Sequence, residues 1–423
     1  MRVVVWGINY APEVAGIAPH NVALCEFLAK KDVDVEMVTT FAYYPMWKKS
    51  AQDRHRLFRT DVINDVWVYR CWHFVPARVS AWKRIIHEAT FVLTSTLRAL
   101  TLPRPDVYVV VSPPLLLGMA AWFVTLFKRA PIVFLVKDLQ PDAAIGLGMV
   151  RAGWFTRALY WLEAFAYKHA TMVGGLSNEM LEAFRRKGVP DKKILLFPDG
   201  VVVPDELPAR GNFRARHRMT DADFLAVYSG NLGVKQGLKI LIDAAEHLRD
   251  QPNIRIVICG DGAARASLER SMQDRHLQNV TMLPLQSDRG YKELLVDADI
   301  SLITQQSGSG NAFFPSKILM TLAHGCPVVT VADEESALAK AVRDGNCGTN
   351  VLPGDAAKLA QTFRDLAQDR PASAKATAGR QSLREWGKNG RAYVARYDRG
   401  KLLADFFAKL KSLGHDDACP SNQ

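Results

Sequence analysis

Short apolar runs alternate with longer amphipathic segments from the first residue to about residue 198. The short runs are rich in valine and isoleucine and have the length of buried strands, whereas the longer segments have helical spacing. We expect strands at residues 3–6, 33–39, 66–70, 107–111, 132–136, 172–174 and 194–197. We expect helices at residues 21–31, 81–100, 115–127, 154–169 and 178–187. This alternation predicts an α/β fold with a parallel, doubly wound sheet.

The alternation starts again after residues 198–208, whose prolines and glycine make them the best candidate for a linker. Strands are expected at residues 224–228, 254–259, 280–283, 300–303 and 328–331. Helices are expected at residues 238–248, 263–276, 291–297, 315–324, 335–344 and 356–369. In open α/β sheets ligands bind at the carboxyl ends of the strands. Two such domains are therefore expected to face each other across a cleft that holds the chemistry.

These patterns predict an N-terminal Rossmann-like domain over residues 1–200 and a C-terminal one over residues 201–380. A length of 423 residues supports two domains, because a single core rarely grows so large. Residues 381–413 are strongly helical and are expected to close the fold by packing back on the N-terminal domain. Residues 414–423 are expected to form a disordered tail.

Composition narrows the classes of protein that fit. Hydrophobic residues make up 48% and charged residues 23%, the balance of a soluble globular enzyme. The 6 cysteines are scattered without a CxxC pair, which favours reduced thiols over disulfides or metal ligands. The opening residues fit a buried strand rather than a secretory signal, and no apolar run is long enough to span a bilayer, so we expect a cytoplasmic location. A net charge of +11 calls for an anionic partner: nucleic acid, an acidic membrane surface or a phosphorylated substrate.

Three glycine-containing segments follow predicted strands in the second half of the chain. They are SGNLGVKQGL at 229–238, ICGDG at 258–262 and SGSGNAFFPSK at 307–317. Glycine lets backbone N–H groups approach an anion, and the start of a following helix adds partial positive charge. In the third segment Pro315 fits a first helical position and places Ser316 and Lys317 in the first turn. This set suits a pyrophosphate, although each loop alone could be an ordinary strand–helix turn and Lys317 a solvated surface lysine.

Short motifs in order along nearly the whole chain resemble the retaining glycosyltransferases with the GT-B fold, of the family 4-like type. The motifs are GINYAPE (7–13) with GI (16–17), YYP (43–45), VSPP (111–114), KDLQPD (137–142) with GLG (146–148), GNL (230–232) with QGL (236–238), GDG (260–262), PLQ (284–286), AD (298–299) and PSK (315–317) with GCPVV (325–329). The resemblance is nearest to bacterial enzymes that build surface polysaccharides such as colanic acid and O-antigen.

The resemblance implies transfer of a hexosyl or deoxyhexosyl group from a UDP- or GDP-linked sugar to a hydroxyl, with retention of configuration. No metal or other cofactor is required, because fixed hydrogen-bond donors in a water-poor cleft stabilise the leaving diphosphate. Asp138 and Lys317 receive catalytic roles, with Asp138 orienting the acceptor or the donor sugar. A strand-end aspartate is also commonly a helix N-cap or an ion-pair partner. Donor binding is assigned to Gly16, Gly230, Asn231, Lys235, Gln236, Gly260, Gln286, Ser316 and Lys317.

The sequence departs from the family pattern at several positions. Many relatives have glutamates at the positions of Ala312 and Met320, arginine and lysine near Asn231 and Gln236, and a histidine at Lys137. Groups in the first turn of the helix after residue 315, or backbone groups, then have to contact the donor sugar. An inactive, membrane-associated partner subunit with the same fold is therefore an alternative.

Residues 70–87 mix tryptophan with basic residues and run into an apolar helix. Tryptophan and arginine at a polar–apolar boundary suit a helix that lies on an anionic membrane. The family's acceptors are often saccharides on polyprenyl diphosphate, so we expect a peripheral location on the inner face of the cytoplasmic membrane. A core helix with basic ends and a surface that stacks nucleobases are the alternatives. No nucleic-acid motif accompanies the segment, so no nucleic-acid partner is expected.

Two other enzyme classes use comparable nucleotide-binding domains. A nucleotide-dependent oxidoreductase would carry GxGxxG after its first strand, where this chain has GINYAP. A sugar-nucleotide epimerase would need paired carboxylates, for which only Glu13 and Asp138 are obvious candidates.

Overall fold

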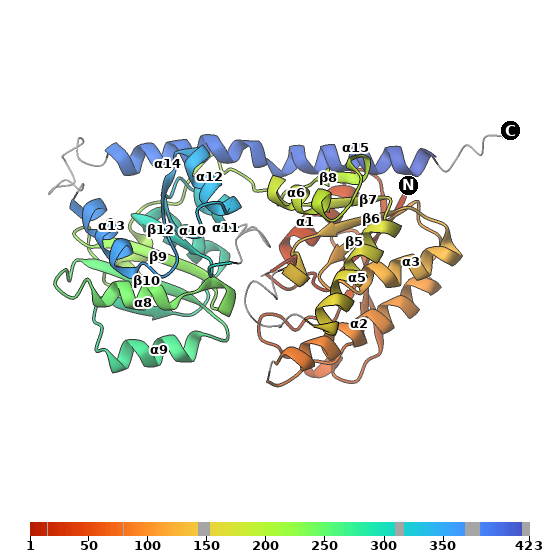
Figure 1. The fold of residues 1–423 in the computed structure, drawn as a ribbon, viewed down its shortest axis with the longest axis horizontal. Coiled ribbons are helices and arrows are strands. Elements are labelled where there is room, and N and C mark those ends of the chain that lie inside the picture. The colour runs from red at the N-terminus through yellow and green to blue at the C-terminus, as the bar shows by residue number, and fades with distance from the viewer. Residues whose placement is uncertain (15, 79, 143–152, 309–316, 369–380, 417–423) are drawn as a thin grey trace. The chain divides into compact units, whose positions relative to one another are not determined.

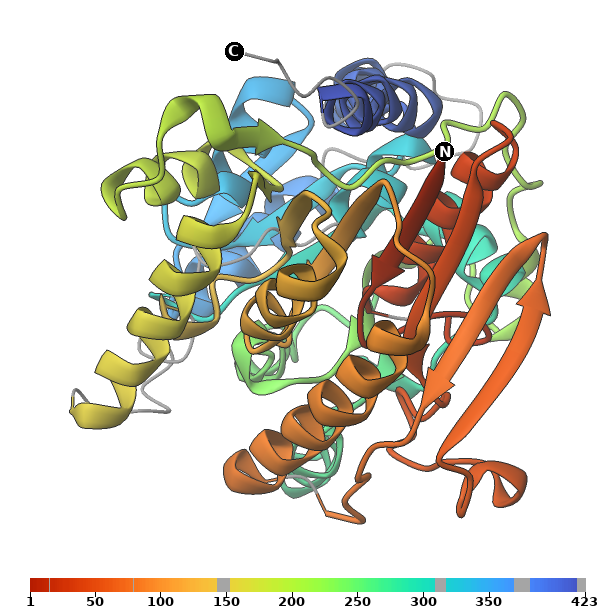
Figure 2. The same cartoon turned by 90° about the vertical axis from the view of Figure 1, so that its right-hand side faces the viewer.

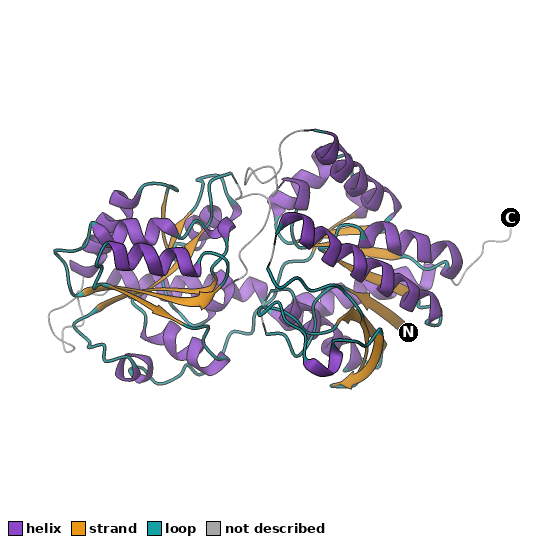
Figure 3. Cartoon of the chain, turned by 90° about the horizontal axis from the view of Figure 1, so that it is seen from below, coloured by secondary structure: helices purple, strands orange, loops and turns teal. Residues whose placement is uncertain are grey.

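The computed structural model describes residues 1–14, 16–78, 80–142, 153–308, 317–368 and 381–416 (Figure 1). The chain divides into two compact units. The N-terminal unit comprises Met1–Gly200 with Gly400–Gln423, and the C-terminal unit comprises Val201–Arg399. Figure 3 shows that each unit consists of strands lying between helices.

The sheet of the N-terminal unit has 8 strands in the order β3-β4-β2-β1-β5-β6-β7-β8. The strands are β1 (Arg2–Trp6), β2 (Asp34–Thr40), β3 (Phe58–Ile63), β4 (Val66–Cys71), β5 (Val107–Ser112), β6 (Ile132–Val136), β7 (Met172–Gly175) and β8 (Ile194–Leu196). All neighbouring pairs are parallel except β3 and β4, which are antiparallel. The central strands β1 and β5 are almost wholly buried and therefore apolar along their length rather than alternating.

Helices cover this sheet. They are α1 (Ala18–Ala29), α2 (Ala81–Thr101), α3 (Leu117–Lys128), α5 (Trp154–His169), α6 (Asn178–Arg186) and, from the end of the chain, α15 (Arg399–Asp416). Figure 2 shows α2, α3 and α5 running side by side, and α3 contacts both of its neighbours. Helix α15 joins the same core as α1, because Phe406 and Leu410 cluster with Leu24 and Leu28.

The sheet of the C-terminal unit has 6 parallel strands in the order β11-β10-β9-β12-β13-β14. The strands are β9 (Phe224–Asn231), β10 (Ile254–Asp261), β11 (Val280–Leu283), β12 (Ile300–Thr304), β13 (Val328–Val331) and β14 (Gly348–Val351). The helices are α7 (Asn212–Arg216), α8 (Lys239–Glu246), α9 (Arg265–Asp274), α10 (Asp288–Asp297), α11 (Lys317–Ala323), α12 (Ala337–Gly345), α13 (Ala356–Gln368) and α14 (Gln381–Val394). Both units are therefore doubly wound parallel α/β structures, as the alternation predicted.

Every expected strand is present, but the pattern missed two strands at sheet edges. Strand β3 pairs only with β4, through a tight turn in which Asn64 and Asp65 both have positive φ. Asparagine and aspartate tolerate that conformation, so the turn makes a hairpin. Strand β14 is short, pairs only with β13 and is mostly half-buried, so its apolar signal is weak.

The C-terminal helices differ from the expectation in two ways. Helix α14 belongs to the C-terminal unit, where it contacts α11 and α12, whereas α15 belongs to the core of the N-terminal unit. Helix α15 also continues through residues 414–416, where the sequence pattern placed the start of the tail. A Cβ at Gly414 would lie 3.5 Å from Met1 and 3.6 Å from Asp106, so packing against the start of the N-terminal unit holds this turn. Residues 417–423 lie outside the described residues.

The chain passes between the units twice, at residues 200–201 and 399–400. Val201 forms a parallel bridge with Asp398. The N–H of Val201 donates to the carbonyl of Tyr397 at 2.9 Å, and the N–H of Arg399 donates to the carbonyl of Val201 at 3.0 Å. The outgoing and returning segments are thus hydrogen-bonded to each other within the C-terminal unit.

Candidate functional site

Two glycines meet at the carboxyl edge of the C-terminal sheet. Strands β9 and β10 pair in register up to their ends, so that Gly230 lies opposite Gly260 and Asn231 lies opposite Asp261. Gly260 has φ of +154°, and a Cβ there would lie 1.9 Å from the carbonyl oxygen of Gly230. Only glycine allows this approach of the two backbones.

The loop after β9 is packed closely against that edge. A Cβ at Gly233 would lie 2.7 Å from Oε1 of Gln236, and a Cβ at Gly262 would lie 2.6 Å from Oδ1 of Asn231. Neither glycine can therefore carry a side chain without moving these amides. The side-chain oxygen Oε1 of Gln236 is buried and has no hydrogen-bond partner among the described residues. A buried acceptor in that state favours a ligand or water that donates to it.

Strand β12 holds the same loop from its other side. The hydroxyl of Thr304 donates to the carbonyl of Gln236 at 2.5 Å, and the N–H of Gln306 donates to the carbonyl of Lys235 at 2.9 Å. Because β9 lies between β10 and β12, the loops after all three strands converge at this edge.

Lys317, at the start of α11, lies at the same edge. Its Nζ is 3.8 Å from the centroid of the Tyr228 ring and 3.9 Å from the position of a Cβ at Gly230. Burial lowers the pKa of Lys317 to about 7. An anion bound beside Gly230 would favour the charged form and raise that pKa again. The arrangement suits a bound phosphate, because no carboxylate among the described residues is recorded as an ion-pair partner of Lys317.

The structure thus brings Gly230, Asn231, Gln236, Gly260 and Lys317 together. Lys235 lies in the same loop. Gln286 follows the neighbouring strand β11 and donates from its side-chain amide to the carbonyl of Pro284 at 2.8 Å. Met320 is partly buried against the core of the C-terminal unit. Ser316 and Ala312 lie outside the described residues, so their predicted contacts stay predictions, as do the binding roles of the whole set.

Gly16 belongs to loops at the carboxyl edge of the other sheet, in the N-terminal unit. It has φ of +67°, and a Cβ there would lie 3.4 Å from the Tyr44 ring. Glu13 joins these loops: its Oε1 accepts from the N–H groups of Tyr43 at 2.9 Å and Tyr44 at 2.8 Å, and its Oε2 accepts from Asn9 at 2.8 Å. Burial raises the pKa of Glu13. With both oxygens occupied, Glu13 holds the backbone rather than reacting.

Asp138 is the second residue after the end of β6 and is half-buried near Arg84 of α2. Desolvation opposes the charge of Arg84, but Glu88 and, more weakly, Tyr43 and Asp138 raise its pKa overall. Arg84 also donates to Glu88 at 3.1 Å. Asp138 therefore lies near the Arg84 guanidinium, at the carboxyl edge of the N-terminal sheet.

A cluster of two histidines and two aromatic residues lies in the same unit and was missed by the sequence patterns. The ring of Tyr43 is 4.6 Å from that of His87 and 5.0 Å from that of His73, and the ring of Trp47 is 5.2 Å from that of His87. Burial lowers the pKa of His87 to about 4 and that of His73 well below its usual value. Both rings are therefore neutral at pH 7. No local spacing links these residues, because they come from the segments after β2 and β4 and from α2.

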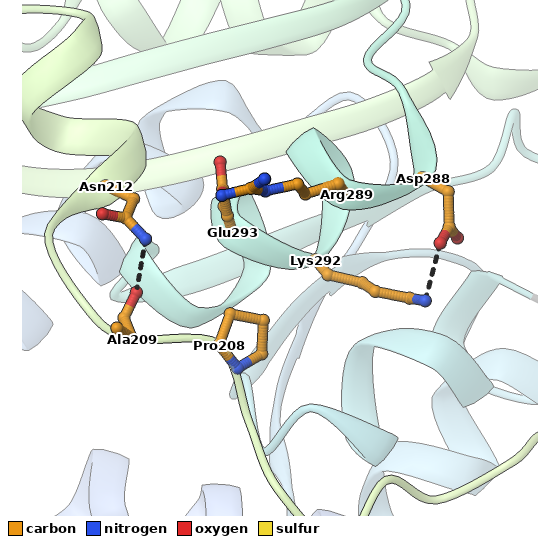
Figure 4. Close-up of a pocket in the computed structure, with 7 residues that line it drawn as sticks. All are labelled: Pro208, Ala209, Asn212, Asp288, Arg289, Lys292 and Glu293. Atoms are coloured by element: carbon orange, nitrogen blue, oxygen red, sulfur yellow. Dashed lines mark hydrogen bonds and ion pairs between the residues drawn. The ribbon is translucent and has the colours of Figure 1, made fainter.

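A recess of about 490 Å³ lies between α7 and α10 (Figure 4). It is lined by Pro208, Ala209, Asn212, Asp288, Arg289, Lys292 and Glu293. Lys292 pairs with Asp288 at 2.6 Å, and Arg289 pairs with Glu293 at 2.9 Å. Its charges are thus paired with one another, and it contains none of the predicted site residues.

Within the described ranges, no group of three or more His, Cys, Asp or Glu side chains is arranged to hold a metal ion. Among the same residues, no helix has both the length and the hydropathy needed to cross a membrane.

Comparisons with known proteins agree with this architecture. Residues 15–200 match the glycosyl transferase 4-like domain, and residues 209–392 match the glycosyl transferases group 1. The chain is 32% identical over 346 residues to WcaI of Escherichia coli (strain K12), named as a colanic acid biosynthesis glycosyl transferase, covering 79% of this chain and 84% of WcaI.

Solved structures of low sequence identity share the fold. Sucrose-phosphate synthase from Thermosynechococcus elongatus aligns with a TM-score of 0.75 at 17% identity, over 97% of this chain and 98% of that one. Anabaena HepE in complex with UDP-glucose aligns with a TM-score of 0.67 at 16% identity, over 97% of this chain and 100% of HepE. With two α/β units and a relative of this identity, the chain belongs to the glycosyltransferases that join a 4-like domain to a group 1 domain in the GT-B fold.

Proposed function

We propose that this protein transfers a sugar from a UDP- or GDP-linked donor to a hydroxyl group, with retention of the anomeric configuration. The observation that carries the proposal is the edge where Gly230, Gly260 and Lys317 meet. Two close backbones, a helix start and one lysine suit a diphosphate. HepE, which shares the fold, has been crystallised with UDP and with UDP-glucose, which supports a nucleotide sugar as the donor.

The leaving diphosphate is the group that most needs stabilisation. The bond between C1 of the sugar and the phosphate oxygen breaks, the acceptor oxygen bonds to C1, and the acceptor proton passes to the leaving phosphate on the same face. Fixed donors at the phosphate favour this charge without reorganisation. In the proposal, Asn231, Lys235, Gln236, Ser316 and Lys317 supply them.

The remaining predicted residues have supporting roles. Backbone groups at Gly230 and Gly260 approach the phosphates, and Gln286 lies beside the base. Gly16 reaches the diphosphate from the first loop of the N-terminal unit. Asp138, near Arg84, orients a sugar hydroxyl. The proposed reaction needs no metal, since the leaving charge is met by protein donors.

The acceptor is proposed to be a saccharide on polyprenyl diphosphate, in the assembly of an exopolysaccharide or O-antigen. The name of WcaI, a colanic acid biosynthesis glycosyl transferase, supports this class of product. A lipid-linked acceptor requires the enzyme to reach a membrane, so we propose a peripheral location on the inner face of the cytoplasmic membrane.

An apolar face on the N-terminal unit supports that location. Helices α2, α3 and α5 lie side by side (Figure 2) and expose large apolar side chains. They are Trp82, Ile85, Ile86, Leu93, Leu97, Phe123, Leu126, Phe127, Trp154, Tyr160 and Trp161. Trp154 and Trp161 are 81% and 58% exposed. Where exposed apolar groups gather into a large patch, they mark a protein or membrane interaction site.

The charges around this face are mostly basic. Lys83, Arg129 and Arg157 lie on or beside the three helices, and Nζ of Lys83 is 5.6 Å from the Trp82 ring. The acidic residues of these helices are neutralised, because Glu88 pairs with Arg84 and Glu163 with Lys187. A basic rim around exposed tryptophan fits an anionic lipid surface.

A panel of nucleotides tests the donor. UDP-sugars and GDP-sugars are mixed with the protein, and its melting temperature is followed, with the Lys317→Met variant alongside. A shift with one of these sugars that is lost in the variant supports the proposal, and product analysis separates transfer from epimerisation. A shift with NAD(P) alone points to an oxidoreductase. No shift with any nucleotide points to an inactive partner subunit.

A further inference from the structure

Asp199 lies at the point where the chain leaves the N-terminal unit, and its carboxylate is almost wholly buried. Nζ of Lys137 donates to Oδ1 of Asp199 at 2.6 Å, with 9% and 7% of the two side chains exposed. Nδ1 of His20 lies 3.3 Å from the same oxygen. One buried carboxylate therefore joins residues that are far apart in the sequence.

The two partners of Asp199 sit beside the loops on which the proposed function depends. Lys137 directly precedes Asp138, and its backbone N–H donates to the carbonyl of Ser112 at 2.9 Å. His20 is in the first turn of α1, shortly after Gly16. A displacement of Asp199 would therefore shift both the loop that contains Gly16 and the loop that contains Asp138.

The crossing segment is anchored on both sides of Asp199. On the N-terminal unit, the Phe197 ring stacks on Phe406 of α15 at 4.2 Å, and Nζ of Lys137 is 5.5 Å from the Phe197 centroid. On the C-terminal unit, Val201 bonds to the returning segment. A single residue separates Asp199 from Val201. The Lys137–Asp199 ion pair and the backbone hydrogen bonds of Val201 therefore fix neighbouring points of the crossing segment.

A buried ion pair is costly to desolvate and is often replaced by apolar residues without loss of stability. The Lys137–Asp199 pair is therefore better explained by the geometry that it imposes than by the stability that it adds. Here it specifies one position for the end of β6 relative to the crossing segment.

We propose that Asp199 is a positioning residue: through Lys137 and His20 it limits the motion between the two units and sets the position of the Asp138 loop. The part of this inference that concerns Asp138 rests on the proposed function. The part that concerns motion between the units does not.

Distances between the units test the inference directly. Spin labels on Lys30→Cys, just after the end of α1, and Arg270→Cys of α9 report one distance distribution for the full chain, with and without UDP or GDP. The variants are Asp199→Asn, Lys137→Met, the two combined, and Lys137→Arg, which keeps the cation. Arg59→Met is the matched control, because Arg59 pairs with Asp53, whose side chain is also 7% exposed but lies far from the crossing in the sequence.

Without nucleotide, Asp199→Asn and Lys137→Met should each broaden the distribution, the double variant should be no broader than either, and Lys137→Arg should restore the native width. Arg59→Met should leave it unchanged. Native widths in Asp199→Asn and Lys137→Met, at melting temperatures that show folded protein, would overturn the inference. So would equal broadening by Arg59→Met. If wild type binds neither nucleotide, the proposed function fails, and the widths without nucleotide still decide this inference.

Discussion

The amine nitrogen of Lys317 lies 3.8 Å from the centroid of the Tyr228 ring. The Tyr228 hydroxyl donates to the carbonyl of Asn231 at 2.8 Å, so the ring spans the end of β9 beneath the glycine edge. The lysine is thus held where a cation–π contact partly offsets its desolvation. Because burial lowers the pKa of Lys317 to about 7, its charge near neutral pH depends on what binds beside it.

Replacing Lys317 with methionine should weaken UDP or UDP-sugar binding by about 10- to 100-fold, the value of one charge-assisted hydrogen bond. In the free protein the amine is charged below its pKa and neutral above it, so binding of the anion must take up a proton above pH about 7. Wild-type affinity should therefore fall as pH rises through that value, and the variant should lack this dependence. Calorimetric titration across pH measures both effects.

Lys239→Met is the control for that titration, since Lys239 is 72% exposed on α8 and pairs with Asp243. It should bind as the wild type does at every pH. An unchanged affinity in Lys317→Met would remove this lysine from the donor site.

Gly260→Ala should destabilise the C-terminal unit by about 2–4 kcal/mol and abolish nucleotide binding, because its Cβ would collide with the carbonyl of Gly230. Gly354→Ala is the control that has backbone strain without a steric clash. Gly354 also has positive φ, +91°, but nothing lies within 4 Å of its Cβ position. It should cost only about 1 kcal/mol and leave binding intact. Thermal unfolding with and without UDP tests the pair. Equal losses in both variants would contradict the close approach of the two strands.

Trp154→Ser combined with Trp161→Ser should weaken binding to vesicles of anionic lipid by at least about tenfold, since each indole loses roughly 1–3 kcal/mol of apolar burial. Alanine at Trp82, Lys83 and Arg84 should also weaken it, more at low salt. Co-sedimentation with vesicles measures both. Trp67→Ser is the control, because Trp67 is 48% exposed on β4 and lies outside the three helices. Equal binding by the altered and native proteins would exclude this face.

Lys137→Met should lower kcat by about 10- to 100-fold while the donor KM stays within about twofold, because a misplaced Asp138 loop affects geometry more than donor binding. Lys137→Arg should recover most of the activity. Steady-state kinetics with the nucleotide sugar selected by the binding panel provides the measurement. A rise in KM at constant kcat would instead place Lys137 in binding.

Much of each sheet could be predicted because parallel strands buried on both faces are continuous apolar runs. Strand β3 was missed because its residues alternate between exposed and half-buried positions at a sheet edge. The end of α15 was missed because Gly414 weakens a helix in isolation, whereas contact with the N-terminal unit supports it there.

The loops proposed to bind the donor could be located from glycine and lysine at strand ends, but their mutual contacts could not. Glu13 illustrates the limit: its residue type permits an acid–base role. Only the structure shows that one of its oxygens accepts from two backbone N–H groups and the other from the Asn9 side chain. The cluster of His73 and His87 has no local pattern at all, since its members meet through the order of the strands.

The amino-acid sequence by itself determined the two α/β halves, their glycine loops and the candidate residues, because backbone conformation and burial periodicity are local properties. The tertiary structure decided that Gly230 faces Gly260, that Lys317 lies over Tyr228 with a lowered pKa, and that Lys137 pairs with Asp199. Strand order and desolvation create these relationships. Both depend on residues distant in the chain, so no local pattern can encode them.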